Sequence, residues 1–198
     1  MPEQSATGAT DATAGMMMIV VGPSGAGKDS LMAIAARHFA GHDKVHFTRR
    51  AITRPHDAGG EDHEALSDTV FAERHAAGDF AVSWQAHGLS YGIPAEMLDR
   101  VARGQLVIAN GSRSALADIR TAFGRLRVVN ITASPEVLAA RLEARGRESR
   151  DDILRRLDRS SLTVAGDFDV VTIDNSGALE DAGQALIAML ELALTDLR

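Results

Sequence analysis

The chain contains a nine-residue stretch whose residue types and spacing suit the binding of phosphate groups. Residues 22–30 read GPSGAGKDS and directly follow the apolar run 16–21. Glycines let the backbone curl so that successive N–H groups point inward at an oligophosphate, and Lys28 is spaced to reach the β- and γ-phosphates. We therefore expect a nucleoside triphosphate as the ligand. The residues of this predicted site are Gly22, Pro23, Ser24, Gly25, Ala26, Gly27, Lys28, Asp29 and Ser30.

One position departs from the usual form of this loop, in which a Ser or Thr after the lysine places its hydroxyl on Mg²⁺. Here Asp29 follows Lys28. A carboxylate is a stronger ligand for a hard cation than a hydroxyl and can hold the ion directly or through water. We expect Asp29 to contact Mg²⁺, with Ser30 as a second candidate ligand. The alternative is that Asp29 only caps the start of the helix.

The elements around the loop predict an α/β fold with a parallel sheet. The apolar run before the loop reads as a buried strand, and residues 31–36 begin an amphipathic helix. Further apolar runs, each followed by a helical stretch, predict a sheet covered by helices on both faces. The ligand should lie at the carboxyl ends of the strands. The further predicted strands are 106–109, 126–131 and 170–173, and the helices are roughly 112–122, 135–145 and 178–195.

Composition limits the classes of protein to consider. The 198 residues are 45% hydrophobic, which suits one domain over 16–198. A net charge of −6 gives no electrostatic reason to expect a nucleic acid or an anionic membrane as partner. Residues 1–15 are small, polar and acidic and read as a disordered leader without secretory features. With no cysteine and no membrane-spanning segment, the sequence favours a cytoplasmic protein. It does not indicate the oligomeric state.

Two stretches interrupt the alternation of strands and helices. The stretch 46–94 is rich in Arg, His and Gly, and we expect it to be a small acceptor-binding insertion. The stretch 141–159 is rich in arginine and is broken by Gly146, which predicts two helices joined by a mobile turn. Most of its arginines suit a solvated face with ion pairs, but a lid over 141–156 is the alternative that we favour.

Several segments in order give the chain a resemblance to a known family. It resembles the guanylate kinase group of P-loop phosphotransferases over about residues 16–185, and within that group the ribose 1,5-bisphosphate phosphokinases of bacterial phosphonate catabolism. The resemblance implies the transfer of a phosphoryl group from ATP to ribose 1,5-bisphosphate, giving ADP and 5-phospho-α-D-ribose 1-diphosphate. The matching segments are 22–31, 52–54, 60–67, 83–94, 110–113 and 143–148.

Departures from guanylate kinases favour a sugar over a base as the acceptor. Arg54 takes the place of the first phosphate-binding arginine, but the second has no clear counterpart, and His63 stands where a tyrosine is expected. The strand that would deliver a guanine-reading carboxylate runs instead into Asn110-Gly111-Ser112-Arg113. Guanine N–H groups buried without that carboxylate would cost about 1–3 kcal/mol each.

The resemblance also implies roles for individual residues. Loose phosphoryl transfer needs alignment and charge neutralisation, which Lys28 and the lid arginines Arg141, Arg145 and Arg156 would supply. A phosphate acceptor is already ionised, so no general base is required. The acceptor-binding set that we predict is Arg50, Arg54, His63, Tyr91, Asn110, Ser112 and Arg113.

Other interpretations remain open at this stage. His63 can be an ordinary exposed histidine, Tyr91 can pack beside Trp84, and Asn110 to Ser112 can form only a turn and a helix cap. At the level of function, the alternatives are a guanylate-type nucleoside monophosphate kinase and a non-catalytic guanylate kinase-like binding module. Intact Lys28 and the lid arginines argue against the module.

Overall fold

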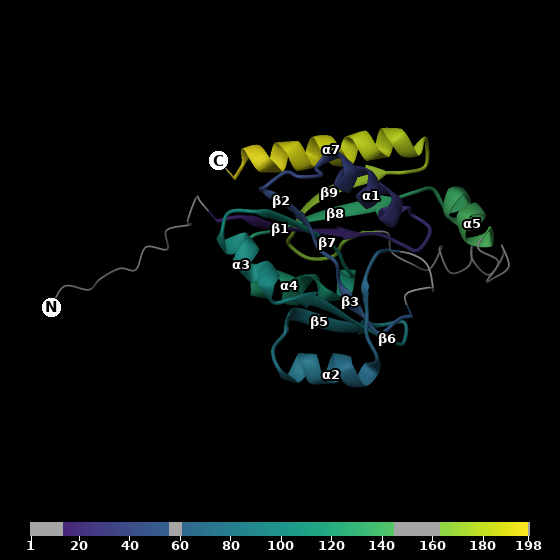
Figure 1. Ribbon diagram of the computed structural model, residues 1–198. Coiled ribbons are helices and arrows are strands. Elements are labelled where there is room, and N and C mark those ends of the chain that lie inside the picture. The colour runs from purple at the N-terminus through teal and green to yellow at the C-terminus, as the bar shows by residue number, and fades with distance from the viewer. Residues whose placement is uncertain (1–13, 56–60, 145–162, 198) are drawn as a thin grey trace.

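The computed structural model describes residues 14–55, 61–144 and 163–197, and its centre is a parallel sheet of five strands. The strand order is β2-β7-β1-β8-β9, and every pairing is parallel (Figure 1). The strands are β1 (Met16–Val21), β2 (Val45–Phe47), β7 (Leu106–Asn110), β8 (Leu126–Thr132) and β9 (Asp169–Asp174). β1 is buried along its whole length, which is why its sequence is continuously apolar rather than alternating.

Helices cover both faces of this sheet. Met16, Met18 and Val20 face a core shared with the helices α1 and α7, whereas Met17 and Ile19 face a second core shared with α3 and α4. Alternate residues of one strand thus serve opposite layers. Figure 1 shows α1 and α7 above the sheet and α3 and α4 below it. The bounds are α1 (Lys28–His38), α3 (Glu96–Ala102), α4 (Leu116–Phe123), α5 (Pro135–Glu143) and α7 (Leu179–Thr195).

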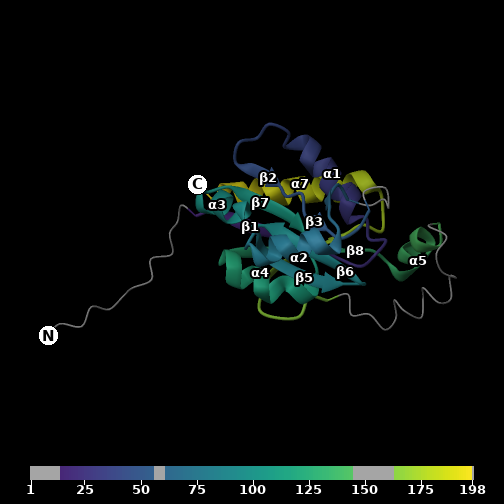
Figure 2. The same cartoon turned by 60° about the horizontal axis from the view of Figure 1, so that its bottom comes forward.

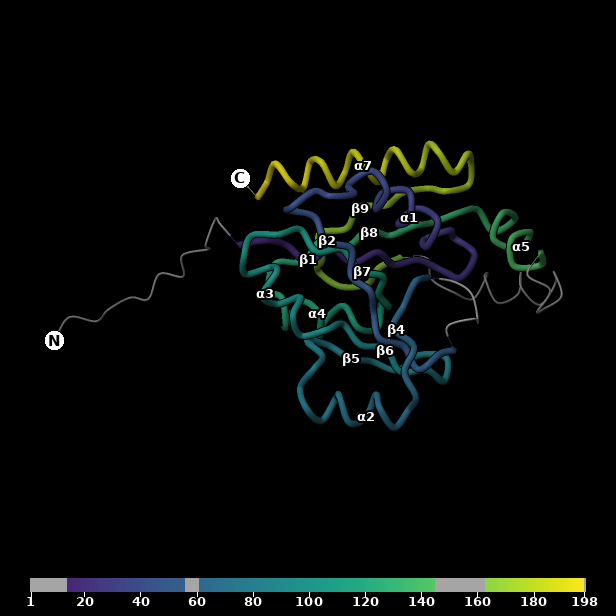
Figure 3. Tube along the Cα trace, in the orientation of Figure 1, coloured from purple at the N-terminus to yellow at the C-terminus, as the bar shows by residue number. Residues whose placement is uncertain are grey.

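A second, four-stranded sheet lies beyond α4. Its order is β4-β3-β6-β5, with β3 and β4 parallel and the other pairs antiparallel. Phe71 of α2 stacks on Phe80 of β5 with ring centroids 4.7 Å apart, so α2 covers the outer side of this sheet (Figure 2). Figure 3 shows the sheet and α2 on the side of the molecule opposite α7. The elements are β3 (Ala51–Ile52), β4 (Glu64–Ala65), α2 (Asp68–Ala76), β5 (Phe80–Ala86) and β6 (Leu89–Pro94).

The strand order determines where a ligand can bind. The connection after β1 leads to β2 on one side of it, whereas the connection after β7 crosses to β8 on the other side, so the winding direction of the sheet changes at β1. Open parallel sheets bind ligands at such a switch point, outside the carboxyl ends of the strands. The loop 22–27 follows β1 at this position and leads into α1. The second sheet approaches the same edge, because Glu61, shortly before β4, contacts Asn110 at the end of β7.

The predicted fold class is confirmed, with small differences at boundaries. All four predicted strands are present, and Ser134 accepts a hydrogen bond from Val137 N at 3.3 Å as the cap of α5. β2 overlaps the start of the predicted insertion 46–94, because its three residues pair with β7 of the central sheet. The predicted leader includes Gly15, whose N–H donates to Val101 O at 2.8 Å, so this residue is already packed.

Among the described residues, no helix is long and apolar enough to cross a membrane.

Candidate active site

The loop after β1 has the backbone that phosphate binding requires. Gly22, Gly25 and Gly27 have φ angles of 153°, 88° and 88°, which residues other than glycine rarely adopt. Gly27 occupies the N-cap position of α1, so the loop continues directly into the positive end of the helix dipole. The chain therefore forms a glycine-rich loop at the switch point of the sheet, with a backbone suited to phosphate binding.

Lys28 lies inside this loop. Its Nζ donates to the carbonyl oxygens of Gly22 at 2.8 Å and Pro23 at 3.1 Å. Burial lowers the pKa of Lys28, and the carboxylate of neighbouring Asp29 partly opposes this effect. A partly desolvated ammonium interacts more strongly with an incoming phosphate than one in bulk water.

Two residues distant in sequence support the loop. Asn175 donates from Nδ2 to Ala26 O at 2.7 Å, and its side chain is buried. Arg141, at the end of α5, donates to Asn175 O at 2.9 Å and to Gly25 O at 3.4 Å. Arg141 thus contacts the loop, and its predicted role toward the transferred phosphoryl group stays a prediction. Asn175 was not predicted from the sequence, because an Asn between a strand and a Ser-Gly turn is typical of an ordinary connection.

The packing of Asn175 against Gly27 gives a first testable prediction. A Cβ added to Gly27 would clash with Asn175 Nδ2, so Gly27→Ala combines this clash with the strain of a positive φ. We expect it to lower the free energy of unfolding by at least about 1–3 kcal/mol and to weaken ATP binding, as measured by denaturant unfolding with and without MgATP. Gly78→Ala is the matched control, because Gly78 has a φ of 80° and a Cβ added there would have no other described atom within 4 Å. Equal losses in the two variants would show that the contact with Asn175 is unimportant.

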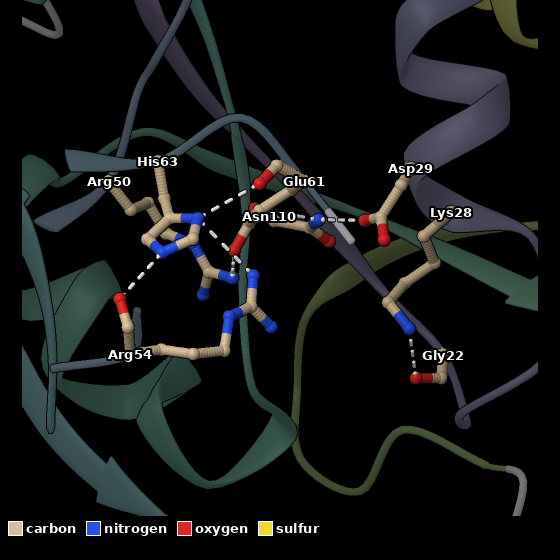
Figure 4. A network of polar contacts seen from close by, with 8 residues as sticks. All are labelled: Gly22, Lys28, Asp29, Arg50, Arg54, Glu61, His63 and Asn110. Atoms are coloured by element: carbon tan, nitrogen blue, oxygen red, sulfur yellow. Dashed lines mark hydrogen bonds and ion pairs between the residues drawn. The ribbon is translucent and has the colours of Figure 1, made fainter. Parts of the chain in front are cut away.

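A chain of polar contacts connects the loop to the second sheet (Figure 4). Asn110, at the end of β7, donates from Nδ2 to Asp29 Oδ1 at 2.8 Å and to Glu61 Oε2 at 3.0 Å. Glu61 Oε1 in turn pairs with the guanidinium of Arg50. Both members of this ion pair are largely buried, with side chains 8% and 14% exposed. The predicted residues Asp29, Arg50 and Asn110 therefore come together around Glu61, a residue that was not predicted as part of the site.

Arg50 rests on an aromatic platform. Trp84 and Tyr91 form a cross-strand pair of β5 and β6, and their rings stack with centroids 5.5 Å apart and planes 6° apart. The Arg50 guanidinium lies 5.4 Å from the Trp84 centroid and 5.1 Å from that of Tyr91, which favours a cation. The ring of Tyr91 therefore packs beside Trp84, the alternative left open by the sequence, and it positions Arg50.

His63 joins Arg54 to the same cluster. The imidazole is buried, 1% exposed, with Nε2 at 3.0 Å from Arg54 O and Nδ1 at 2.9 Å from Glu61 O. Nδ1 also lies 3.3 Å from Arg54 NH2. His63 is thus not an ordinary exposed histidine. Its two ring nitrogens contact backbone carbonyl oxygens of Glu61 and Arg54, so the imidazole connects these two positions.

Ser112 and Arg113 lie just after β7. Ser112 accepts a hydrogen bond from Ser114 N at 3.4 Å and therefore caps the short 3₁₀-helix that begins at Arg113. Arg113 donates to Asn130 Oδ1 at 3.1 Å, and burial lowers the pKa of its guanidinium. Gly111, between the end of β7 and Ser112, is required by packing, because a Cβ added there would clash with Ile19 Cγ2.

The structure alters one argument made from the sequence. The predicted acceptor pocket lacked a carboxylate, because β7 ends in Asn110 rather than in an acidic residue. Glu61 nevertheless brings a carboxylate to Asn110 from a segment 49 residues away in the chain. No local signal distinguishes Glu61 from the other acidic residues near it. The predicted lid residues Arg145 and Arg156 lie outside the described residues.

The residues at the start of α1 suit a bound Mg²⁺. Mg²⁺ is usually held by one or two carboxylates together with substrate phosphates, and the Asp29 carboxylate lies beside the lysine of the phosphate loop. Ser30 is exposed on the first turn of the same helix. When bound, the ion supplies neutralisation of charge on the transferring phosphates. The described residues contain no group of three or more His, Cys, Asp or Glu side chains that would hold a metal without substrate.

The fold and the site together define a class of protein. A parallel sheet with a glycine-rich loop at its switch point, and a separate basic cluster facing that loop, is the arrangement of a P-loop phosphotransferase. Comparison with known families then identifies the group. The guanylate kinase family profile matches residues 14–193, so the chain belongs to the guanylate kinase family.

Individual relatives indicate a subgroup within the guanylate kinase family. A protein of Agrobacterium fabrum named ribose 1,5-bisphosphate phosphokinase PhnN is 64% identical over 88% of this chain and 96% of its own length. A protein of Rhizobium etli with the same name is 59% identical over 92% of each chain. Among solved structures, guanylate kinase from Anaplasma phagocytophilum superposes with a TM-score of 0.61 at 16% identity, covering 91% of this chain and 86% of its own. This structural likeness supports the fold alone.

Proposed function

We propose that the protein transfers the γ-phosphoryl group of ATP to ribose 1,5-bisphosphate, giving ADP and 5-phospho-α-D-ribose 1-diphosphate. This is the reaction implied by the resemblance in the sequence, and relatives up to 64% identical carry the corresponding name. The structural observation that supports it best is a set of three buried polar atoms around Glu61 that have no hydrogen-bond partner among the described residues. They are Arg50 Nε, Arg54 Nε and Asn110 Oδ1.

These three atoms indicate the chemistry of a ligand that would fit the site. Two are N–H donors on guanidinium groups, which bind phosphate oxygens well. The third is an amide oxygen, which accepts from a hydroxyl or an N–H group. A buried polar atom left without a partner costs about 1–3 kcal/mol, so a ligand that supplies both kinds of group would bind favourably here. A phosphorylated sugar with free hydroxyls does so.

The residues then divide into a donor side and an acceptor side. On the donor side, Lys28 and the loop N–H groups hold the phosphates of ATP, and Arg141 holds the loop. On the acceptor side, Arg54 and Arg113 bind phosphate oxygens, and Arg50 is oriented toward them by its aromatic platform. The acceptor phosphate attacks in its ionised form, so no side chain has to remove a proton. Alignment and charge neutralisation account for the chemistry.

A guanylate-type kinase is the main alternative, and Glu61 is the observation that favours it. A carboxylate beside Asn110 can accept from guanine N–H groups, as it can from sugar hydroxyls. The two alternatives therefore predict different acceptors for the same site. A non-catalytic binding module predicts no turnover with either acceptor.

The deciding experiment measures ADP release from MgATP with ribose 1,5-bisphosphate or GMP as acceptor. We expect ADP with the sugar and formation of phosphoribosyl diphosphate in equal amount. ADP release with GMP alone would show that the site reads a base. Absence of turnover with both acceptors would support a binding module.

A further inference from the structure

We propose that Glu61 reads the hydroxyl groups of the acceptor sugar and thereby determines which sugar the site accepts. This inference rests on the proposed function, because it concerns the acceptor side of the same site. It goes further in assigning selectivity to a carboxylate outside the phosphate-binding residues. The juxtaposition that supports it is the contact of Glu61 with both Arg50 and Asn110, opposite Asp29 of the phosphate loop (Figure 4).

The carboxylate of Glu61 is held in one orientation from both sides. Oε1 pairs with Arg50 and Oε2 accepts from Asn110 Nδ2, so each oxygen has one fixed partner. Each carboxylate oxygen can accept two hydrogen bonds, and one acceptor position on each therefore remains available. The side chain is 14% exposed, which gives a small ligand group access to an otherwise buried carboxylate.

Charge decides which part of the acceptor meets this carboxylate. Phosphate oxygens would be repelled by Glu61, whereas sugar hydroxyls can donate to it. A carboxylate that accepts from ribose hydroxyls is a general means of reading ribose in nucleotide-binding sites. Asn110 Oδ1, which has no partner among the described residues, adds a second buried acceptor beside it. The two residues thus present oxygen acceptors between the cations Arg50 and Lys28.

An ion pair for stability alone does not explain this arrangement. A buried Arg–Glu pair contributes little net stability, because desolvation of both charges offsets their attraction. Arg50 is already oriented by the rings of Trp84 and Tyr91. Asn110 Nδ2 donates to the carboxylate of Asp29 as well as to that of Glu61. Two like charges therefore lie close together. The arrangement is understandable if Glu61 has a ligand to accept from.

The test compares ribose 1,5-bisphosphate with its 2-deoxy and 3-deoxy analogues as acceptors. In the unmodified protein we expect kcat/KM to be roughly 10- to 100-fold higher for ribose than for at least one deoxy sugar, the range for a hydrogen bond to a charged group. In Glu61→Ala that ratio should fall to within about threefold, because the lost partner no longer discriminates. Glu61→Gln, which keeps the side-chain volume, should give an intermediate ratio.

Asp62→Ala is the matched control. Asp62 is the next acidic residue, its side chain is 75% exposed, and it pairs with Arg49 at 2.9 Å. We expect this variant to keep the ratio of the unmodified protein. If Glu61→Ala and Glu61→Gln slow all three sugars by the same factor, Glu61 is only structural and the inference is wrong, although the proposed function stands. Turnover of ribose and both deoxy sugars at equal rates by the unmodified protein would also overturn it. Turnover of none of them would overturn the proposed function as well.

Discussion

Lys28→Met should abolish phosphoryl transfer while leaving the protein folded. We expect kcat to fall by at least about 10³-fold, since groups that stabilise developing charge contribute effects of this size. Nζ lies inside the phosphate loop, on the carbonyls of Gly22 and Pro23, and no nearby lysine can replace it, because the chain's only other lysine is Lys44. The measurement is ADP release at saturating MgATP and acceptor.

Stability measurements separate this effect from unfolding. Because burial lowers the pKa of Lys28, the charged ammonium costs folding free energy below that pKa, and the cost is relieved as pH rises from it toward the ordinary lysine value. A neutral Met removes the cost, so we expect a melting temperature at neutral pH no lower than that of the unmodified protein. Exposed Lys44 provides the control Lys44→Met, which should keep full activity. Activity of Lys28→Met within tenfold of normal would contradict the assignment of the loop.

Arg54→Ala should mainly impair use of the acceptor. Arg54 Nε is buried with no partner in the described part of the chain, and its NH2 lies 3.3 Å from His63 Nδ1. The guanidinium therefore has a donor left for phosphate. Losing one or two charge-assisted hydrogen bonds lowers kcat/KM for the acceptor by roughly 10²- to 10³-fold. The KM for ATP should change little, because Arg54 lies on the acceptor side of the site.

The control for Arg54→Ala is a substitution of an arginine that lies remote from the site. Arg103 is exposed at the end of α3, so Arg103→Ala should leave both kinetic constants unchanged. Arg54→Lys keeps the charge but loses the planar fork, and we expect it to restore only part of the activity. An equal rise in KM for ATP and for the acceptor would contradict the division into donor and acceptor sides.

The donor side of the site could be predicted from the sequence because it is local. The loop 22–30 is continuous, and the glycines that it needs for positive φ are read directly from the residue types. The strands of the central sheet were equally recognisable, because strands buried on both faces are continuously apolar. Fold class, nucleotide loop and family follow from such local patterns.

The acceptor side was decided by tertiary structure. Asn110 meets Asp29 across 81 residues of chain and Glu61 across 49, and no local pattern encodes such contacts. The role of Tyr91 depended on its register opposite Trp84, which only strand pairing determines. Asn175 likewise reaches Ala26 because β9 ends beside the phosphate loop. The sequence by itself therefore determined the class of reaction, since phosphate binding uses one continuous segment. Which groups face the acceptor depended on how two sheets pack, because that surface is assembled from segments far apart in the chain.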